Sequence, residues 1–284
     1  MSTEMWPDFN DLWDYSDPAG TEARFRQLLP GAEAGGNRVY HLQLLTQIAR
    51  TLGLQKRFEE ANALLDQVEK QMGGRDIVEV RYLLERGRAL NSSKQAEKAV
   101  PLFKRAFEVA GEIGADFYAV DALHMLGIAA PDGERLDWNV KAITYAERSS
   151  QDRARKWLGS LYNNTGWTLF DEERYAEALE LFLKAQAFRE EQGQEEEARI
   201  ARWCVAKTLR VLGRVDEALE ILRGLEAAGD SEGFTEEEIA ECLYALGKVD
   251  EARDYFKTAY EKLAQIDWMA EDQGRIARLK ALAE

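Results

Sequence analysis

The feature that most constrains the fold is a segment of about twelve residues that recurs along the chain roughly every 34 to 40 residues. In each copy a basic and an apolar residue precede acidic residues, then an alanine, then apolar residues four and seven positions after the alanine. This spacing predicts a helix with one buried apolar stripe. The copies lie at 57–68, 174–185, 214–225 and 248–259, with weaker ones around Ala99 and Asn139.

A second small residue stands twelve positions before each alanine or its equivalent, which predicts a preceding helix that packs closely against the first. Glycines that follow the second helices indicate where those helices stop, because glycine readily adopts the left-handed backbone at a helix end. The small residues are Ala49, Gly87, Gly127, Gly166, Ala206 and Ala240, and the glycine stops are Gly73-Gly74, Gly114, Gly193 and Gly229.

This pattern resembles the tetratricopeptide repeat family, and in particular its stand-alone bacterial members. Residues 159–192 carry the resemblance best, through Tyr162, Gly166, Leu169, Tyr175, Ala178, Phe182 and Ala185. The resemblance implies an all-α, right-handed superhelical α-solenoid of about six helix pairs with terminal capping helices. The third pair fits least well, since Asn139 replaces the usual alanine. The long period leaves another α-solenoid family, such as HEAT, as the alternative.

We expect three regions along the chain. Residues 1–41 form an N-terminal cap or degenerate leading repeat, in which Asp17-Pro18 starts a helix over 18–29 that ends at Pro30-Gly31. Residues 42–265 form the repeat array. Residues 266–284 form a C-terminal cap, with a helix from Trp268 to Ala283, because the terminal units of a solenoid have only one neighbour.

Composition restricts the partners. The net charge of −15 argues against nucleic acid and acidic membranes, since both are repelled by a negative field. No apolar run is long enough to span a membrane, and no signal peptide is visible at the N-terminus. With only two cysteines, Cys204 and Cys242, we expect a reduced, cytoplasmic protein.

The resemblance also implies that the first helices line an inner groove, which binds a protein or peptide. Asn163 and Asn164 would hold a peptide backbone, because an amide both donates and accepts hydrogen bonds. Trp167 and Trp203 would form an anchor pocket beside them. Alternatively, the asparagines tie helices together and the tryptophans pack in the core. The candidate groove residues are Gln47, Arg50, Arg81, Arg88, Asp121, His124, Asn163, Asn164, Trp167, Trp203, Lys207 and Arg210.

Charge along this groove is graded, from arginines in the first two units to glutamates in the last. A partner with an acidic segment would match the arginines, and such fields set register and association rate. The alternative is that Arg81, Glu85 and Arg88 only pair along their own helix. A carboxylate clamp of the family's chaperone type is not expected, since His124 and Cys204 stand where clamp residues would be required.

No motif for catalysis, a metal or a cofactor is present. The two histidines, His41 and His124, are not in a metal-binding spacing, and no glycine-rich phosphate loop occurs. We therefore expect a non-enzymatic scaffold that binds a protein or peptide, with no cofactor. The alternatives are a peptide-sensing regulator of the bacterial tetratricopeptide type, and a small-molecule binder or enzyme with a pocket in the solenoid.

The N-terminal segment interleaves aromatic residues with aspartates. Aromatic residues among acids are typical of a docking peptide, so the segment is expected either to fold back onto the arginine-rich first repeats or to reach another molecule. The alternative is an ordinary apolar cap. The residues are Trp6, Phe9, Leu12, Trp13 and Tyr15, with Asp8, Asp11, Asp14 and Asp17 between them.

Overall fold

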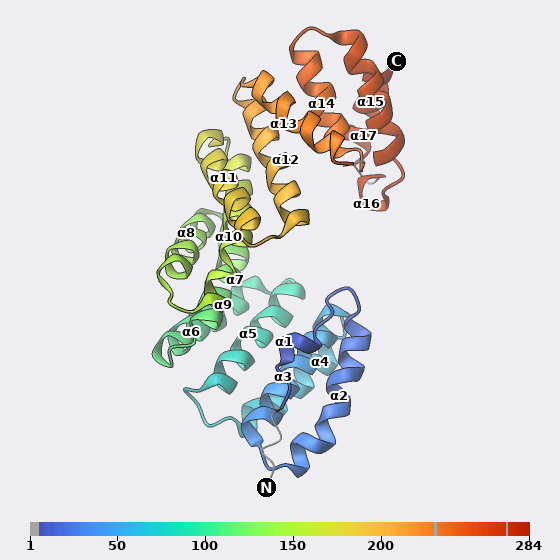
Figure 1. Ribbon diagram of the computed structural model, residues 1–284. Helices are drawn as coiled ribbons and strands as arrows, with labels where there is room; N and C mark the ends of the chain where they lie inside the picture. Colours follow the sequence, from blue (N-terminus) through green and yellow to red (C-terminus); the bar gives the residue numbers. More distant parts are fainter. Residues whose placement is uncertain (1–5, 230–231, 271) are drawn as a thin grey trace. The chain divides into compact units, whose positions relative to one another are not determined.

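Paired antiparallel helices follow the predicted repeat in the computed structural model, which describes residues 6–229, 232–270 and 272–284 (Figure 1). No strand occurs among these described residues, so the predicted all-α repeat fold is confirmed. The helices are α1 (Phe9–Leu12), α2 (Pro18–Ala34), α3 (Arg38–Leu54), α4 (Phe58–Gln71), α5 (Ile77–Ser92), α6 (Ala96–Glu112), α7 (Asp116–Ala129), α8 (Asp132–Arg148), α9 (Asp152–Arg155), α10 (Leu158–Asp171), α11 (Tyr175–Glu191), α12 (Glu195–Val211), α13 (Val215–Ala227), α14 (Phe234–Ala245), α15 (Val249–Leu263), α16 (Asp267–Ala270) and α17 (Gln273–Ala283).

The six predicted repeats are the pairs α3/α4, α5/α6, α7/α8, α10/α11, α12/α13 and α14/α15. In every second helix the marked alanine, or Asn139 in α8, is buried. The large side chain one turn later is buried as well, and together these residues form the core between paired helices. Those side chains are Leu65, Phe103, Ile143, Phe182, Leu222 and Phe256.

The small residues of the first helices allow this close packing. A Cβ atom at Gly87 would lie 2.4 Å from Cε1 of Phe103. In the third repeat, a Cβ atom at Gly127 would lie 1.9 Å from Oδ1 of Asn139. Asn139 therefore packs against the small residue of its pair, and the sequence departure in this repeat leaves the helix pair intact.

The N-terminal helix is longer than predicted. α2 begins at Pro18, where Asp17 caps it by accepting a hydrogen bond from the Gly20 amide, but it continues through Pro30 to Ala34. The predicted end at Pro30-Gly31 is therefore wrong. Ala32 is buried beyond the proline, so packing of the last turn outweighs the backbone hydrogen bond that proline cannot make.

The C-terminal helix is shorter than predicted. α17 begins at Gln273, after Asp272, whose side chain accepts from the Arg275 amide. Trp268 instead belongs to the separate four-residue helix α16. α17 packs mainly on α15 and buries Leu279 completely, so it covers the last repeat.

The chain divides into two compact units, residues 1–157 (unit 1) and 158–284 (unit 2). Unit 1 contains α1 to α9, and unit 2 contains α10 to α17. Within each unit, successive helices of the array pack against one another. Among the described residues, no helix is both long and apolar enough to cross a membrane.

Candidate functional site

Four aromatic side chains form a row in unit 2, on the face built by the first helices of its repeats. Trp167 of α10 lies 6.2 Å from Trp203 of α12, measured between ring centroids, and Trp203 lies 6.3 Å from Phe234 of α14. Trp268 of α16 stacks on Phe234 at 5.9 Å. Three of the rings come from the first helices of successive repeats, and Trp268 comes from the C-terminal cap.

The row lines a cleft of about 470 Å³, which we call the aromatic cleft. Trp268 is 63% exposed and Ile200 is 50% exposed, so much apolar surface is open to a partner. The Nε1 group of Trp203 donates to the Phe234 carbonyl oxygen at 3.2 Å, which satisfies its only polar atom. The lining residues are Trp167, Arg199, Ile200, Trp203, Lys207, Glu232, Phe234, Trp268 and Arg275.

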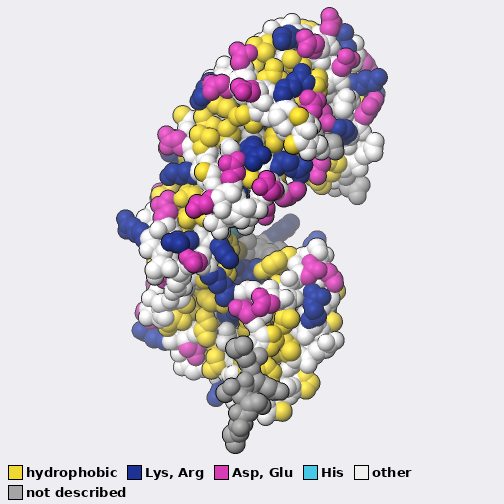
Figure 2. All heavy atoms as spheres, viewed as in Figure 1, with side chains coloured by type: hydrophobic (Ala, Val, Ile, Leu, Met, Phe, Trp, Pro, Cys, Tyr) yellow, Lys and Arg dark blue, Asp and Glu magenta, His cyan; other side chains and the backbone are white. Residues whose placement is uncertain are grey.

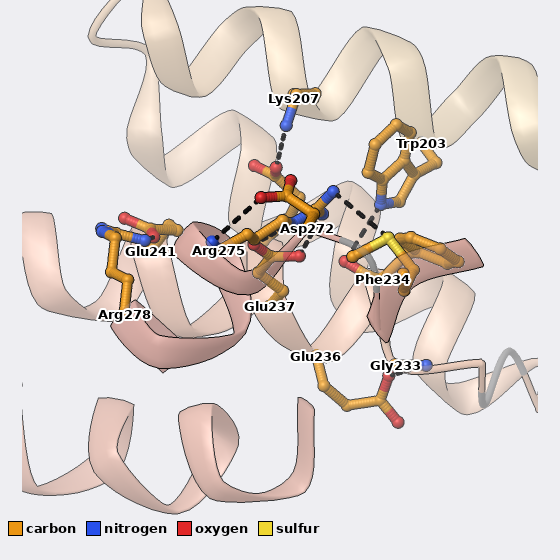
Figure 3. Close-up of polar contacts among 12 residues, drawn as sticks. Trp203, Lys207, Gly233, Phe234, Glu236, Glu237, Glu241, Asp272, Arg275 and Arg278 are labelled. Atoms are coloured by element: carbon orange, nitrogen blue, oxygen red, sulfur yellow. Dashed lines mark hydrogen bonds and ion pairs between the residues drawn. The ribbon is translucent and has the colours of Figure 1, made fainter. Parts of the chain in front are cut away.

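Beside the cleft, α14 carries glutamates that are paired with cations from neighbouring helices (Figure 3). Arg275 of α17 forms a two-point ion pair with Glu237, and its guanidinium also lies 5.7 Å from the Phe234 ring. The other pairs are Lys207 and Arg210 with Glu238, Lys262 with Glu236, and Arg278 with Glu241.

Glu238 is the most deeply placed of these acids, at 1% exposure. Burial alone would raise the pKa of Glu238, but Lys207 and Arg210 together lower it below its ordinary value. Arg210 Nε donates to Glu238 at 2.7 Å. The group is therefore a buried carboxylate that joins α12 to α14.

These ion pairs neutralise the glutamates at the acidic end of the predicted groove. Glu237, Glu238 and Glu241 each have a cationic partner. Basic and acidic side chains are also interspersed over the visible surface (Figure 2). What distinguishes this face of unit 2 is therefore its aromatic surface rather than its net charge.

The predicted asparagine pair lies outside the lining of the aromatic cleft. Asn163 Nδ2 donates to Asn164 Oδ1 at 3.3 Å, and the Cys204 thiol donates to Asn163 Oδ1 at 3.8 Å. Burial raises the pKa of Cys204 to about 12, so this thiol stays protonated. Asn164 remains exposed on α10.

In unit 1 the structure brings the predicted polar residues together around a small cavity of about 80 Å³. Arg88 pairs with both Glu85 and Asp121, and Arg50 reaches Glu85 at 3.4 Å. Arg81 is 7% exposed and donates to the Tyr118 hydroxyl. The arginines predicted to bind an acidic partner thus already form ion pairs or hydrogen bonds within unit 1.

The N-terminal segment, residues 6–17, lies across the first-helix face of unit 1. Trp13 Nε1 donates to Gln47 Oε1 at 3.0 Å, and the guanidinium of Arg50 lies 5.5 Å from the Trp13 ring. Phe9 is buried and stacks on Tyr40. The guanidinium carbon of Arg81 lies 4.9 Å from the centroid of the Phe9 ring. The segment is therefore both an apolar cap and an occupant of the face where a ligand was expected.

His124 lies close to Arg88 and Asp121 of the polar network in unit 1. Its ring is 5.2 Å from the Trp157 ring, and burial, with Arg88 nearby, lowers the pKa of His124 although Asp121 opposes the shift. Among the described residues, no group of three or more His, Cys, Asp or Glu side chains could hold a metal ion.

Several lining residues were not among the sequence candidates. Phe234 occupies the groove position at the start of its repeat, as the register predicts. Trp268 and Arg275 follow the last repeat, and only the fold of the C-terminal cap brings them to the aromatic cleft. Trp157 likewise lies outside the repeats, just before the fourth one, and lines the cavity of unit 1.

Comparison with known proteins supports the repeat architecture. Residues 174–266 match the model of the tetratrico peptide repeat family. No curated protein is similar to the chain in sequence.

Solved structures extend the likeness over most of the chain. The apo form of RapI has a TM-score of 0.72 at 13% identity, over 91% of this chain and 76% of that one. The signal transduction ATPase PH0952 from Pyrococcus horikoshii, which has a tetratricopeptide repeat sensor, has a TM-score of 0.67 at 15% identity, over 95% of this chain and 44% of that one. YrrB, described as a TPR protein with an unusual peptide-binding site, has a TM-score of 0.52 at 16% identity, over 76% and 96%.

Proposed function

We propose that this chain, of which residues 174–266 match the tetratricopeptide repeat family, is a tetratricopeptide repeat protein that acts as a non-enzymatic scaffold and binds a protein or peptide in the aromatic cleft of unit 2. The observation that carries the proposal is the row of four rings from four helices, open on one side. Aromatic residues in such clefts dominate binding energy at protein interfaces. The peptide-binding site named for YrrB supports the same class of ligand.

The chemistry of the lining indicates what the partner offers. Its apolar surface suits an aromatic or aliphatic side chain inserted between Trp203 and Trp268. Four charged side chains surround that surface: Arg199, Lys207, Arg275 and Glu232. The three basic ones already pair with Glu196, Glu238 and Glu237, respectively. We therefore propose that the inserted apolar side chain determines binding, that an acidic segment of the partner contributes little, and that the site takes neither nucleic acid nor membrane.

A cytoplasmic site of action is part of the proposal. It rests on the two cysteines, which are both free and buried, as expected for a reduced compartment. The second candidate is a peptide-sensing regulator, which would use the same cleft and pass its output to a further protein. The tetratricopeptide repeat sensor of PH0952 supports this candidate.

The test is selection of peptides from a random library on the full chain, followed by anisotropy measurements on the selected peptides. We expect the selected peptides to share an apolar or aromatic residue. Trp203→Ala and Trp268→Ala should each weaken binding by about 30-fold, as expected for hot-spot residues. Trp268→Ala is the cleaner variant, because this side chain is largely exposed.

The matched control is Trp138→Ala on α8, a second helix of unit 1. It should bind like the parent protein. Peptides that bind Trp203→Ala and Trp268→Ala as tightly as the parent would remove the aromatic cleft as the site. Asn163→Ala and Asn164→Ala report on the predicted asparagine pair in the same assay.

A further inference from the structure

The small cavity of unit 1 contains polar atoms that the protein itself does not satisfy. Among the described residues, Arg50 Nε, Arg81 Nε, Trp157 Nε1 and Glu85 Oε2 are buried and have no hydrogen-bond partner. All four side chains line the cavity. Buried polar groups are almost always paired, so four orphans around one space indicate a missing partner.

Size limits what that partner is. A water molecule needs roughly 10–15 Å³ of such space, so a cavity of about 80 Å³ holds five to eight water-sized groups. The N-terminal segment covers the opening, with Trp13 and Tyr15 in the lining and their rings stacked at 4.8 Å. A peptide chain does not fit beneath this cover, whereas one small molecule of five to eight non-hydrogen atoms does.

The donors and acceptors define its chemistry. Three of the orphans are N–H donors, from Arg50, Arg81 and Trp157, and they match the lone pairs of a carboxylate. The fourth, Glu85 Oε2, is an acceptor and matches an ammonium group. Arg81 and Glu85 are 7% and 5% exposed, so both recognition elements are shielded from water.

Charge supports the carboxylate of this ligand. Arg50 and Arg81 line the cavity together with Glu85 and Asp121, and Arg88 pairs with both acids from beside it. The arginines therefore exceed the acids, and a carboxylate of the ligand offsets a positive charge that is costly to bury. The ammonium group is assigned by the unpartnered Oε2 of Glu85 alone.

We propose that unit 1 binds a small free α-amino acid, of the size of glycine to threonine, beneath the N-terminal segment. The carboxylate accepts from Arg50, Arg81 and Trp157, and the ammonium group donates to Glu85. Residues 6–17 act as a lid, held by Trp13 on Gln47 and by the Asp8–Arg153 ion pair at 3.7 Å. This site is separate from the aromatic cleft, since all its residues belong to unit 1.

The experiment is calorimetric titration of the full chain with glycine, alanine, serine and threonine at millimolar concentration. Propionate and ethylamine each carry only one of the two charged groups, and tryptophan exceeds the size limit. We expect at least one small amino acid to bind and to raise the melting temperature by about 5 °C near saturation. The three comparison compounds should have no effect.

Two variants test the assigned roles. Glu85→Gln should weaken binding by about 10- to 100-fold, since it replaces the charged acceptor. Trp157→Phe removes an N–H that has no protein partner, so the variant should fold normally, as circular dichroism will show, and bind at least tenfold more weakly. Trp138→Phe is the matched control, and Trp203→Ala should bind the amino acid like the parent chain.

Three results would overturn the proposal. One is that no small amino acid binds, in which case the orphan groups contact water only. Another is binding that neither Glu85→Gln nor Trp157→Phe weakens. The third is that a peptide with a free C-terminal carboxylate binds at this site while free amino acids do not. Because Trp203→Ala tests the aromatic cleft separately, failure of either proposal is distinguishable from failure of the other.

Discussion

At the residue scale, the recurring small residues define how closely two helices approach. Gly127 and Gly166 lie where a Cβ atom would meet Asn139 Oδ1 at 1.9 Å and Phe182 Cε1 at 2.7 Å. In a helix glycine costs about 1 kcal/mol relative to alanine. The chain retains it here because overpacking costs more, about 1–3 kcal/mol.

Alanine substitutions at a packed and at an open helical glycine should change stability in opposite directions. Gly127→Ala should lower the free energy of unfolding by about 1–3 kcal/mol, because its methyl group enters the space of Asn139. Gly224→Ala in α13, where nothing lies within 4 Å of the added Cβ, should raise it by about 0.5–1 kcal/mol. Urea unfolding of both variants measures the two signs. Stabilisation by Gly127→Ala would show that the helix pair relaxes freely.

Glu238 supports a prediction on pH. Its pKa in the folded protein is lowered from the ordinary 4.5, so its stabilising contribution is complete above that value and is lost as the pH falls through the lowered folded pKa. Glu238→Gln should cost about 1–3 kcal/mol at neutral pH. The difference in unfolding free energy between parent and variant should shrink below pH 4.5.

The control is Glu220→Gln, at an exposed position on α13, which should change stability little at any pH. Denaturant titrations at neutral pH and at several acidic values give both differences. If the difference in unfolding free energy between the parent and Glu238→Gln did not change with pH, the role assigned to Lys207 and Arg210 would be wrong.

At the scale of elements, the two ends of the chain do more than close the array. The N-terminal segment covers the polar cavity of unit 1 with Trp13 and Tyr15. At the other end, α16 and α17 supply Trp268 and Arg275 to the aromatic cleft of unit 2. Both proposed sites therefore combine first helices of repeats with residues from outside the repeats.

This predicts that the C-terminal cap controls the stability of its own unit. Leu279 of α17 is fully buried, so Leu279→Ala should cost about 2–5 kcal/mol. In a repeat array such damage spreads through neighbours, so hydrogen exchange should accelerate first in α14, α15 and α17. Lys280→Ala, at an exposed position, is the control. Equal loss of protection in unit 1 would show that the chain unfolds as one cooperative block.

At the scale of the whole molecule, charged side chains near the two proposed sites pair with opposite charges from other helices. The net charge of −15 includes the glutamates of α14, each of which has a basic partner from another helix. In unit 1, Arg88 likewise pairs with Glu85 and Asp121, and Arg153 pairs with Asp8 of the N-terminal segment. Counting charges along a groove is therefore a weak guide to its ligand, because neighbouring repeats neutralise one another.

The amino-acid sequence by itself determined the repeat fold. The position of Ala178 relative to Gly166 and Phe182 is local, and helix periodicity converts that spacing directly into a packed pair. The sequence also identified Trp167 and Trp203 as neighbours, since both occupy groove-facing positions on the first helices of successive repeats, α10 and α12.

Only the tertiary structure decided which groups are available. Arg81 is buried against Tyr118, and Arg88 is ion-paired with Asp121 of another helix. Trp268 and Trp157 reach their cavities from segments outside the repeat register. The end of α2 beyond Pro30 was set in the same way, by burial of Ala32. Periodicity describes one helix pair at a time, whereas burial, ion pairing and cavity formation depend on side chains that meet only when the units assemble.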